Sequence, residues 1–289
     1  MPHTTLVAAD ELAAHLDDPA WIVFDCRHDL AQPDAGEAAY AAAHVPGARF
    51  LHLDRDLAGP VTGTNGRHPL PDPRRFAEKL ASAGVNADSQ VVAYDDTGGM
   101  YAARLWWMLR WIGHPAAAVL DGGWKAWTSK GNAGSSDIPQ PRTGNLTAAP
   151  RDIAVDTAFL LTHLRQPGMR IVDARAEDRY RGENETLDPV GGRIPGALNR
   201  FFRDNLDATG CFKPATQLHA DFSRVLQDTA PTTVVHQCGS GVTACHNLLA
   251  MEIAGLAGSR LYPGSWSEWC ADPARPVVTG PAEHTGPVP

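Results

Sequence analysis

The 289-residue sequence has no long apolar run that could cross a membrane. Its most apolar stretch, residues 105–112, is interrupted by Arg110 and falls well short of the roughly 20 residues that a membrane helix needs. The N-terminal segment has no basic region followed by an apolar core, so we expect no signal peptide. These absences predict a protein without a membrane partner.

Cysteine and positive charge are also scarce. The five cysteines show no CxxC spacing, which favours neither a disulfide framework nor a zinc site and suggests a reducing cytoplasm. The net charge of −8 argues against a nucleic-acid partner, because phosphate binding needs basic patches. What is present, 43% hydrophobic and 20% charged residues, describes an ordinary globular protein with ample core.

The sequence contains an internal repeat with a period of about 145 residues, which indicates two copies of one domain. Four landmarks recur in the same order: Ile22–Arg27 with Ile171–Arg175, His44–Ala48 with Arg193–Ala197, Val91–Asp95 with Val234–Cys238, and Gly122–Trp127 with Gly264–Trp269. We therefore expect domains at 1–130 and 151–289, a linker at 131–150, and a proline-rich tail from about residue 272 that lies extended or frays.

Short β-branched runs alternate with helix-length segments in each copy, which predicts an α/β fold with mainly parallel sheets flanked by helices. The expected strands are 22–25, 91–94 and 118–120 in the first copy, and 171–173, 233–236 and 261–262 in the second. The expected helices of the first copy are 74–83, 101–112 and 124–130, with Asp72 and Pro73 as start signals.

The second copy carries a cysteine at a turn between a strand and a helix. Cys238 is followed by a loop with Gly239 and Gly241, and then by an apolar helix. Backbone N–H groups of residues 239–243 and the positive end of the helix would favour a thiolate, the nucleophilic form of cysteine. A buried structural cysteine would not need the glycines, so we interpret this loop as functional. The first copy has Asp95 at this position and is expected to lack the chemistry.

The loop sequence Cys-Gly-Ser-Gly-Val-Thr-Ala at 238–244 resembles the active-site loop of the rhodanese superfamily, in the form found in 3-mercaptopyruvate sulfurtransferases. The resemblance implies that Cys238 is the nucleophile and that Ser240, His68 and Asp54 form a proton relay. It also implies that Arg179 binds the charged end of the donor. The loop residues Gly239, Gly241, Val242 and Thr243 would surround the bound sulfur.

One position departs from this family's pattern. The family usually carries a second substrate arginine nine residues after the first, and this chain has Asp188 there. Arg193, which precedes Ile-Pro-Gly where many relatives have histidine, is our candidate for the missing charge.

We therefore predict a sulfurtransferase that needs no cofactor and no metal, because the cysteine sulfur carries the transferred group. The donor would be 3-mercaptopyruvate, with thiosulfate as the alternative, and the acceptor a thiol, a thioredoxin-like protein or cyanide. A cysteine phosphatase is disfavoured because Ala244 stands where a Cys-x5-Arg loop needs arginine. A non-catalytic sulfur carrier remains the distant alternative.

Overall fold

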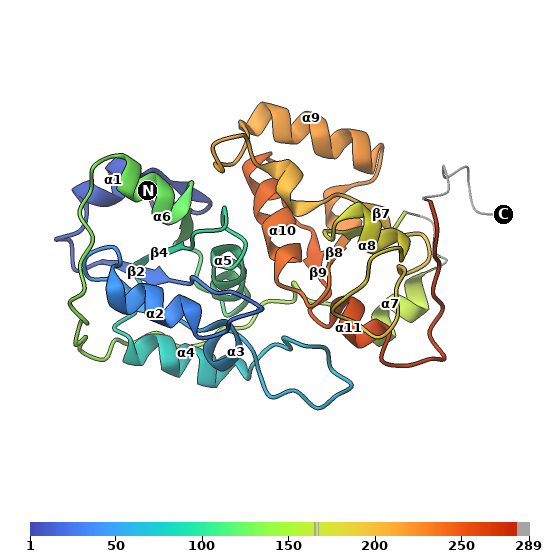
Figure 1. Cartoon of the computed structure of the whole chain (residues 1–289), viewed down its shortest axis with the longest axis horizontal. Coiled ribbons are helices and arrows are strands. Elements are labelled where there is room, and N and C mark those ends of the chain that lie inside the picture. Colours follow the sequence, from blue (N-terminus) through green and yellow to red (C-terminus); the bar gives the residue numbers. More distant parts are fainter. Residues whose placement is uncertain (165, 167, 282–289) are drawn as a thin grey trace.

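The computed structural model describes residues 1–164, 166 and 168–281. It contains two parallel sheets, each with helices on both faces (Figure 1). The predicted α/β fold is confirmed. Among the described residues, none of the helices combines the length and apolarity needed to cross a bilayer.

The first sheet has five strands. Their order across the sheet is β1 (Leu6–Val7), β5 (Ala117–Leu120), β4 (Gln90–Tyr94), β2 (Trp21–Asp25) and β3 (Arg49–Phe50). The helices of this half are α1 (Ala9–Ala14), α2 (Ala35–Ala42), α3 (Leu53–Asp56), α4 (Pro73–Ser82), α5 (Ala102–Trp111) and α6 (Gly123–Ser129). The strands predicted at 22–25, 91–94 and 118–120 are confirmed to within a residue at either end.

The second sheet has four strands and repeats the central pattern of the first. Their order is β7 (Leu198–Asn199), β6 (Arg170–Asp173), β8 (Val234–Gln237) and β9 (Arg260–Leu261). The α-helices of this half are α7 (Thr157–His163), α8 (Glu177–Arg181), α9 (Ala215–Leu226), α10 (Thr243–Ile253) and α11 (Ser265–Trp269). Two short 3-10 helices, η1 (Phe202–Asn205) and η2 (Pro231–Thr233), complete it.

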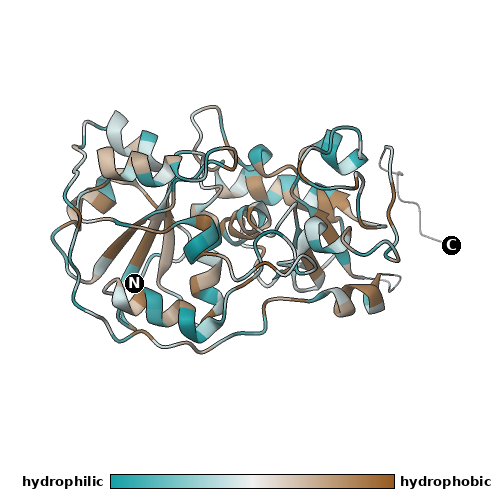
Figure 2. Cartoon of the chain, turned by 60° about the horizontal axis from the view of Figure 1, so that its bottom comes forward, coloured by the Kyte–Doolittle hydropathy of each residue, from teal (hydrophilic) through white to brown (hydrophobic). Residues whose placement is uncertain are grey.

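Side chains of each central strand point alternately to the two faces of its sheet, and helices cover both faces. In β2, Ile22 and Phe24 belong to a core shared with α4 and α5, whereas Val23 packs in a separate core with α1 and α6. Successive side chains of a strand point to opposite faces, so a continuous apolar run needs helices on both sides. Figure 2 shows brown strands between the helices of the first half, on the side of the molecule where the N-terminus lies.

The two halves share one hydrophobic core. Residues of α5 from the first half and of α10 from the second belong to the same buried cluster, and the two helices lie side by side (Figure 1). This packing fixes the first half against the end of β8 where Cys238 follows. The halves are therefore joined by core packing as well as by the chain.

Residues 136–153 form neither helix nor strand, and several of their amides bond to the first half. Gly144 donates to the Ala81 carbonyl and Ala149 to the Ile112 carbonyl. The segment between the repeats thus lies along the first domain, while the predicted domain bounds of 1–130 and 151–289 stay a prediction. In the tail, Val278 pairs with Arg193 through a β-bridge. The prolines at 287 and 289 lie outside the described residues.

Candidate functional site

Cys238 lies at the carboxyl end of β8, where the chain turns into α10. Its side chain is buried, and the Gly241 amide donates a hydrogen bond to Sγ over 3.2 Å. Gly241 has φ of +79°, and a Cβ atom there would lie 2.3 Å from the Pro263 carbonyl oxygen. Only glycine fits this position, so the loop can bring its backbone donor to the sulfur.

Ser265 forms a hydrogen bond to the backbone of Cys238, and the sequence analysis did not identify this residue. Its Oγ accepts a hydrogen bond from the Cys238 amide over 3.0 Å and donates to the Tyr262 carbonyl over 2.9 Å. Ser265 has φ of +53°, a left-handed conformation that is unusual for a residue other than glycine. The internal repeat could have revealed this position, because the equivalent residue of the first copy is a glycine, Gly123, with φ of +57°.

The first copy fills its own loop with a carboxylate. The Asp95 side chain is fully buried and accepts hydrogen bonds from the amides of Thr97, Gly99, Tyr101 and Ala102, at 2.7–2.9 Å. These backbone donors surround the carboxylate as the second-copy loop would surround a charged sulfur. The backbone donors of this loop are therefore already occupied by the Asp95 carboxylate, and the loop contains no cysteine.

Three predicted relay residues form one hydrogen-bonded chain across the two halves. His68 Nδ1 lies 2.7 Å from Ser240 Oγ, and His68 Nε2 lies 3.1 Å from Asp54 Oδ1. Ser240 and His68 are buried, whereas 45% of the Asp54 side chain is exposed. The carboxylate can only accept, so Nε2 carries the proton and Nδ1 accepts from the serine hydroxyl. Burial and the nearby Arg104 lower the pKa of His68 to about 4, which keeps the ring neutral at physiological pH.

Arg104, on α5, fixes the position of this relay relative to the cysteine loop. Its guanidinium is fully buried and donates to the Gly241 carbonyl over 3.2 Å and to the His68 carbonyl over 3.0 Å. One side chain of the first half thus connects the cysteine loop to the segment that contains His68. The sequence offered no motif for it, since an arginine within an apolar helix reads as a surface residue.

Arg179 lies near the loop but is already paired with acidic groups. Its guanidinium donates to both carboxylate oxygens of Glu185 at 2.8–3.3 Å and lies 3.5 Å from Asp188 Oδ2. Burial opposes the ionisation of Glu185, but the hydrogen bonds and charge of Arg179, together with the amides of Leu187 and Asp188, lower the pKa of this carboxyl. Burial raises the pKa of Asp188, against the pull of Arg67 and Arg179.

Arg67, which precedes the relay histidine, reaches the same place from the first half. A Cβ atom built on Gly239 would lie 2.9 Å from Arg67 Nη2 and 3.5 Å from Arg179 Nη2. The two guanidinium groups therefore converge beside Gly239, the residue between Cys238 and Ser240. Arg67 also forms an ion pair with Asp188. Sequence reasoning did not single out Arg67, because domain packing alone brings it here.

Arg193, the sequence candidate for the missing charge, faces a different region. Its guanidinium donates to the carbonyls of Gly280 over 2.6 Å and Pro281 over 2.9 Å, and it stacks over the Tyr180 ring. It therefore anchors the C-terminal tail, and we no longer assign it to donor binding. Of the remaining loop residues, Val242 is buried before α10 and Thr243 is its first residue.

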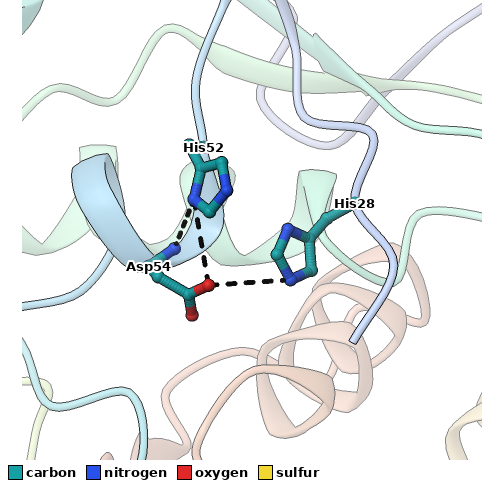
Figure 3. A group of neighbouring side chains, drawn as sticks. All are labelled: His28, His52 and Asp54. Atoms are coloured by element: carbon teal, nitrogen blue, oxygen red, sulfur yellow. Dashed lines mark hydrogen bonds and ion pairs between the residues drawn. The ribbon is translucent and has the colours of Figure 1, made fainter. Parts of the chain in front are cut away.

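His28, His52 and Asp54 form a group whose possible ligand atoms lie within 4.8 Å of one another (Figure 3). However, His52 Nδ1 accepts hydrogen bonds from the amides of Asp54 over 3.1 Å and Arg55 over 3.4 Å, where it caps α3. A metal would have to take this lone pair from the helix cap. The arrangement fits a helix cap and a ring packed beside Asp54 better than a metal centre.

Several known proteins are similar to this chain over most of its length. A "Probable 3-mercaptopyruvate sulfurtransferase" of Pseudomonas aeruginosa is 48% identical over 283 residues, which are 97% of this chain and 100% of the relative. The thiosulfate sulfurtransferase of Bos taurus is 36% identical over 239 residues, 80% of this chain and 78% of the relative. The crystal structure of SseA from Escherichia coli, a 3-mercaptopyruvate sulfotransferase, superposes with a TM-score of 0.80 at 32% identity; the match covers 91% of this chain and 99% of the SseA chain.

The family model described as "Rhodanese-like domain" matches twice, at residues 8–130 and 156–272. The two matches coincide with the two sheets and with the internal repeat of the sequence. The chain belongs to the rhodanese-like family, with a cysteine loop in its second domain and a carboxylate in the equivalent loop of its first.

Proposed function

We propose that this enzyme transfers a sulfur atom from 3-mercaptopyruvate to a thiol, a thioredoxin-like protein or cyanide through a persulfide on Cys238. The observation that carries the proposal is the chain Ser240–His68–Asp54 beside a buried cysteine, which can move a proton at the point where sulfur leaves carbon. The proposal concerns a sulfurtransferase, the class named for the relatives above.

The first half-reaction balances without a cofactor. The Cys238 thiolate attacks the thiol sulfur of the donor, an S–S bond forms, and the C–S bond breaks to leave the enolate of pyruvate. The proton of the donor thiol then moves to the methylene carbon of the enolate. The products are pyruvate and a Cys238 persulfide anion, which together carry the same charge as the reactants.

The relay residues are suited to this proton transfer. A neutral His68 can accept a proton through Ser240 as the donor thiol ionises, and can return it through the same hydroxyl to the enolate. Asp54 orients the ring by accepting from Nε2. The low pKa of His68, about 4, makes the ring a weak base, so it holds the proton only briefly.

The loop would hold the sulfur between the two half-reactions. The Gly241 amide already faces Sγ, and further backbone donors at the start of α10 would stabilise a persulfide anion. A nucleophilic acceptor then takes the outer sulfur and regenerates the thiolate. Because the cycle needs a reduced cysteine, we also propose a reducing compartment such as the cytoplasm.

The test is to locate the transferred sulfur. After treatment with mercaptopyruvate, mass spectrometry of the wild type should show one additional sulfur on the peptide containing Cys238. Cys238→Ser should fold normally and lose turnover, because a hydroxyl is a far weaker nucleophile. Extra sulfur on another cysteine, or turnover by Cys238→Ser, would contradict the assignment. A kcat/KM higher for thiosulfate than for mercaptopyruvate would instead support thiosulfate as the donor.

A further inference from the structure

We propose that Arg67 is the second donor-binding arginine of this enzyme, and that Asp188 and Glu185 tune the site for donors with a single negative charge. The inference rests on the proposed function, since it concerns how the same site selects its donor. It assigns a specificity role to three residues that the loop motif does not contain.

The first step is the position of the two cations. Arg67 comes from the first domain and Arg179 from the second, yet both guanidinium groups face the same side of Gly239. Cys238 and Ser240 flank that glycine, so an anionic group bound by both arginines would lie next to the nucleophile and the relay hydroxyl. Arg67 thus supplies a second guanidinium group beside the cysteine loop, although position 188 of this chain is an aspartate.

The second step is the availability of donors on Arg67. Its backbone amide bonds to Ser267 Oγ over 3.0 Å, which fixes the start of the side chain against the second domain. Its Nη1 faces Asp188, whereas Nη2, beside Gly239, donates no hydrogen bond within the part of the chain that the structure describes. A carboxylate oxygen of the donor can therefore be bound by Nη2 without breaking an existing contact.

The third step is the balance of charge. Arg67 and Arg179 are matched by Asp188 and Glu185, so these four groups sum to zero before a donor binds. The side chains of Asp188 and Glu185 are only 3% exposed, which weakens solvent screening between them and a bound anion. Asp188 Oδ2 is buried without a hydrogen-bond partner among the described residues, and the Arg179 guanidinium lies 3.5 Å from it.

Selectivity follows from the donor charges. Mercaptopyruvate carries one carboxylate, while thiosulfate carries two negative charges on a compact group. Asp188 and Glu185 lower the positive potential of the two arginines, and the binding energy lost in this way is about twice as large for a dianion as for a monoanion. Compared with a site of two unpaired arginines, this site therefore shifts the preference from a dianion toward a monoanion that can still form hydrogen bonds to the arginines.

The experiment measures kcat and KM for both donors in Arg67→Gln, Asp188→Asn and the double variant Arg67→Gln/Asp188→Arg. Arg67→Gln should raise KM for mercaptopyruvate about tenfold or more with kcat within about threefold, because it removes ground-state binding. The double variant, which moves the arginine to the position usual in the family, should recover most of that loss. Asp188→Asn should raise the kcat/KM ratio of thiosulfate to mercaptopyruvate by about tenfold.

Arg75→Gln is the matched control, since Arg75 is an exposed arginine of the same domain and should leave both donors unchanged. If Arg67→Gln does not fold, Arg67→Lys decides: a KM rise of at least about threefold is expected, because one ammonium cannot bind both Asp188 and the donor. An unchanged KM in the folded Arg67 variant, or an unchanged donor ratio in Asp188→Asn, would overturn the inference. Failure of the wild type to form the Cys238 persulfide would instead refute the proposed function, so the two are distinguishable.

Discussion

Replacing Ser240 by alanine tests whether the relay supplies a proton to the carbon from which sulfur departs. The substitution removes the hydroxyl that lies 2.7 Å from His68 Nδ1, and both side chains are buried, so water does not readily replace it. Proton transfer by a positioned group is worth 10²–10⁴-fold in rate. We expect kcat for mercaptopyruvate to fall at least about 100-fold, which corresponds to about 2.7 kcal/mol.

The same variant should hardly affect thiosulfate. Sulfite leaves from an S–S bond and needs no protonation at carbon, so we expect its kcat to change by less than about threefold. Cyanide serves as the acceptor for both donors, and thiocyanate is measured in both cases, which keeps the second half-reaction the same. Measuring persulfide formation in a single turnover reports the first half-reaction alone, so a slow second half-reaction cannot hide the change.

Two further variants test how much His68 and Asp54 each contribute to the relay. His68→Gln should cost as much as Ser240→Ala, because either change interrupts the relay. Asp54→Asn should cost no more than about tenfold, because the Asp54 side chain is 45% exposed and solvent screens its effect on the ring. The exposed Ser223→Ala on α9 is the control and should change neither donor. Equal losses with both donors, or no loss with mercaptopyruvate, would refute the proton-transfer role.

Two other predictions concern stability. Asp95→Asn should lower the free energy of unfolding by about 2–4 kcal/mol, because the amide NH₂ faces backbone N–H donors and loses charge-assisted hydrogen bonds. Its kcat, measured well below the melting temperature, should stay within about tenfold of wild type; a larger loss would mean that the first domain takes part through Asp95. Burial lowers the pKa of His68, His236 and His246 to about 4, 3 and 4. In the unfolded chain these rings have pKa values near 6.5, so below that pH the unfolded chain binds more protons than the folded one. The free energy of unfolding therefore falls as the pH falls, by up to about 4 kcal/mol per pH unit between pH 6 and 4. Chemical unfolding at several pH values measures this slope, and His236→Leu should reduce it by about one third; an unchanged slope would contradict the assignment.

The internal repeat, the alternating strands and the helix-start residues could be recognised from the sequence alone. The central strands follow from local patterns, because strands buried on both faces are continuous β-branched runs. The short strands β1, β3 and β7 and the short helices α3 and α8 were not predicted. Two-residue strands have no period of their own, and they form because the neighbouring strand offers them hydrogen bonds.

Cys238 could also be singled out from the sequence as the candidate nucleophile, since glycines follow it in a loop where Gly241 needs a positive φ and a close backbone approach. The relay of Ser240, His68 and Asp54 came from resemblance to a family, and the structure places the three side chains in hydrogen-bonding contact. Their separations in sequence show why no local pattern could do so: Ser240 and His68 lie 172 residues apart.

What tertiary structure alone decided is the charge around the cysteine. From the sequence, Arg193 was the nearest candidate to replace the arginine absent at position 188. In the folded chain Arg193 holds the tail, and Arg67 reaches Gly239 from the other domain. Sequence patterns predict local structure and which face of a helix or strand is buried. Which side chains meet across a domain interface depends on how α5 packs against α10, and that packing is a property of the whole core.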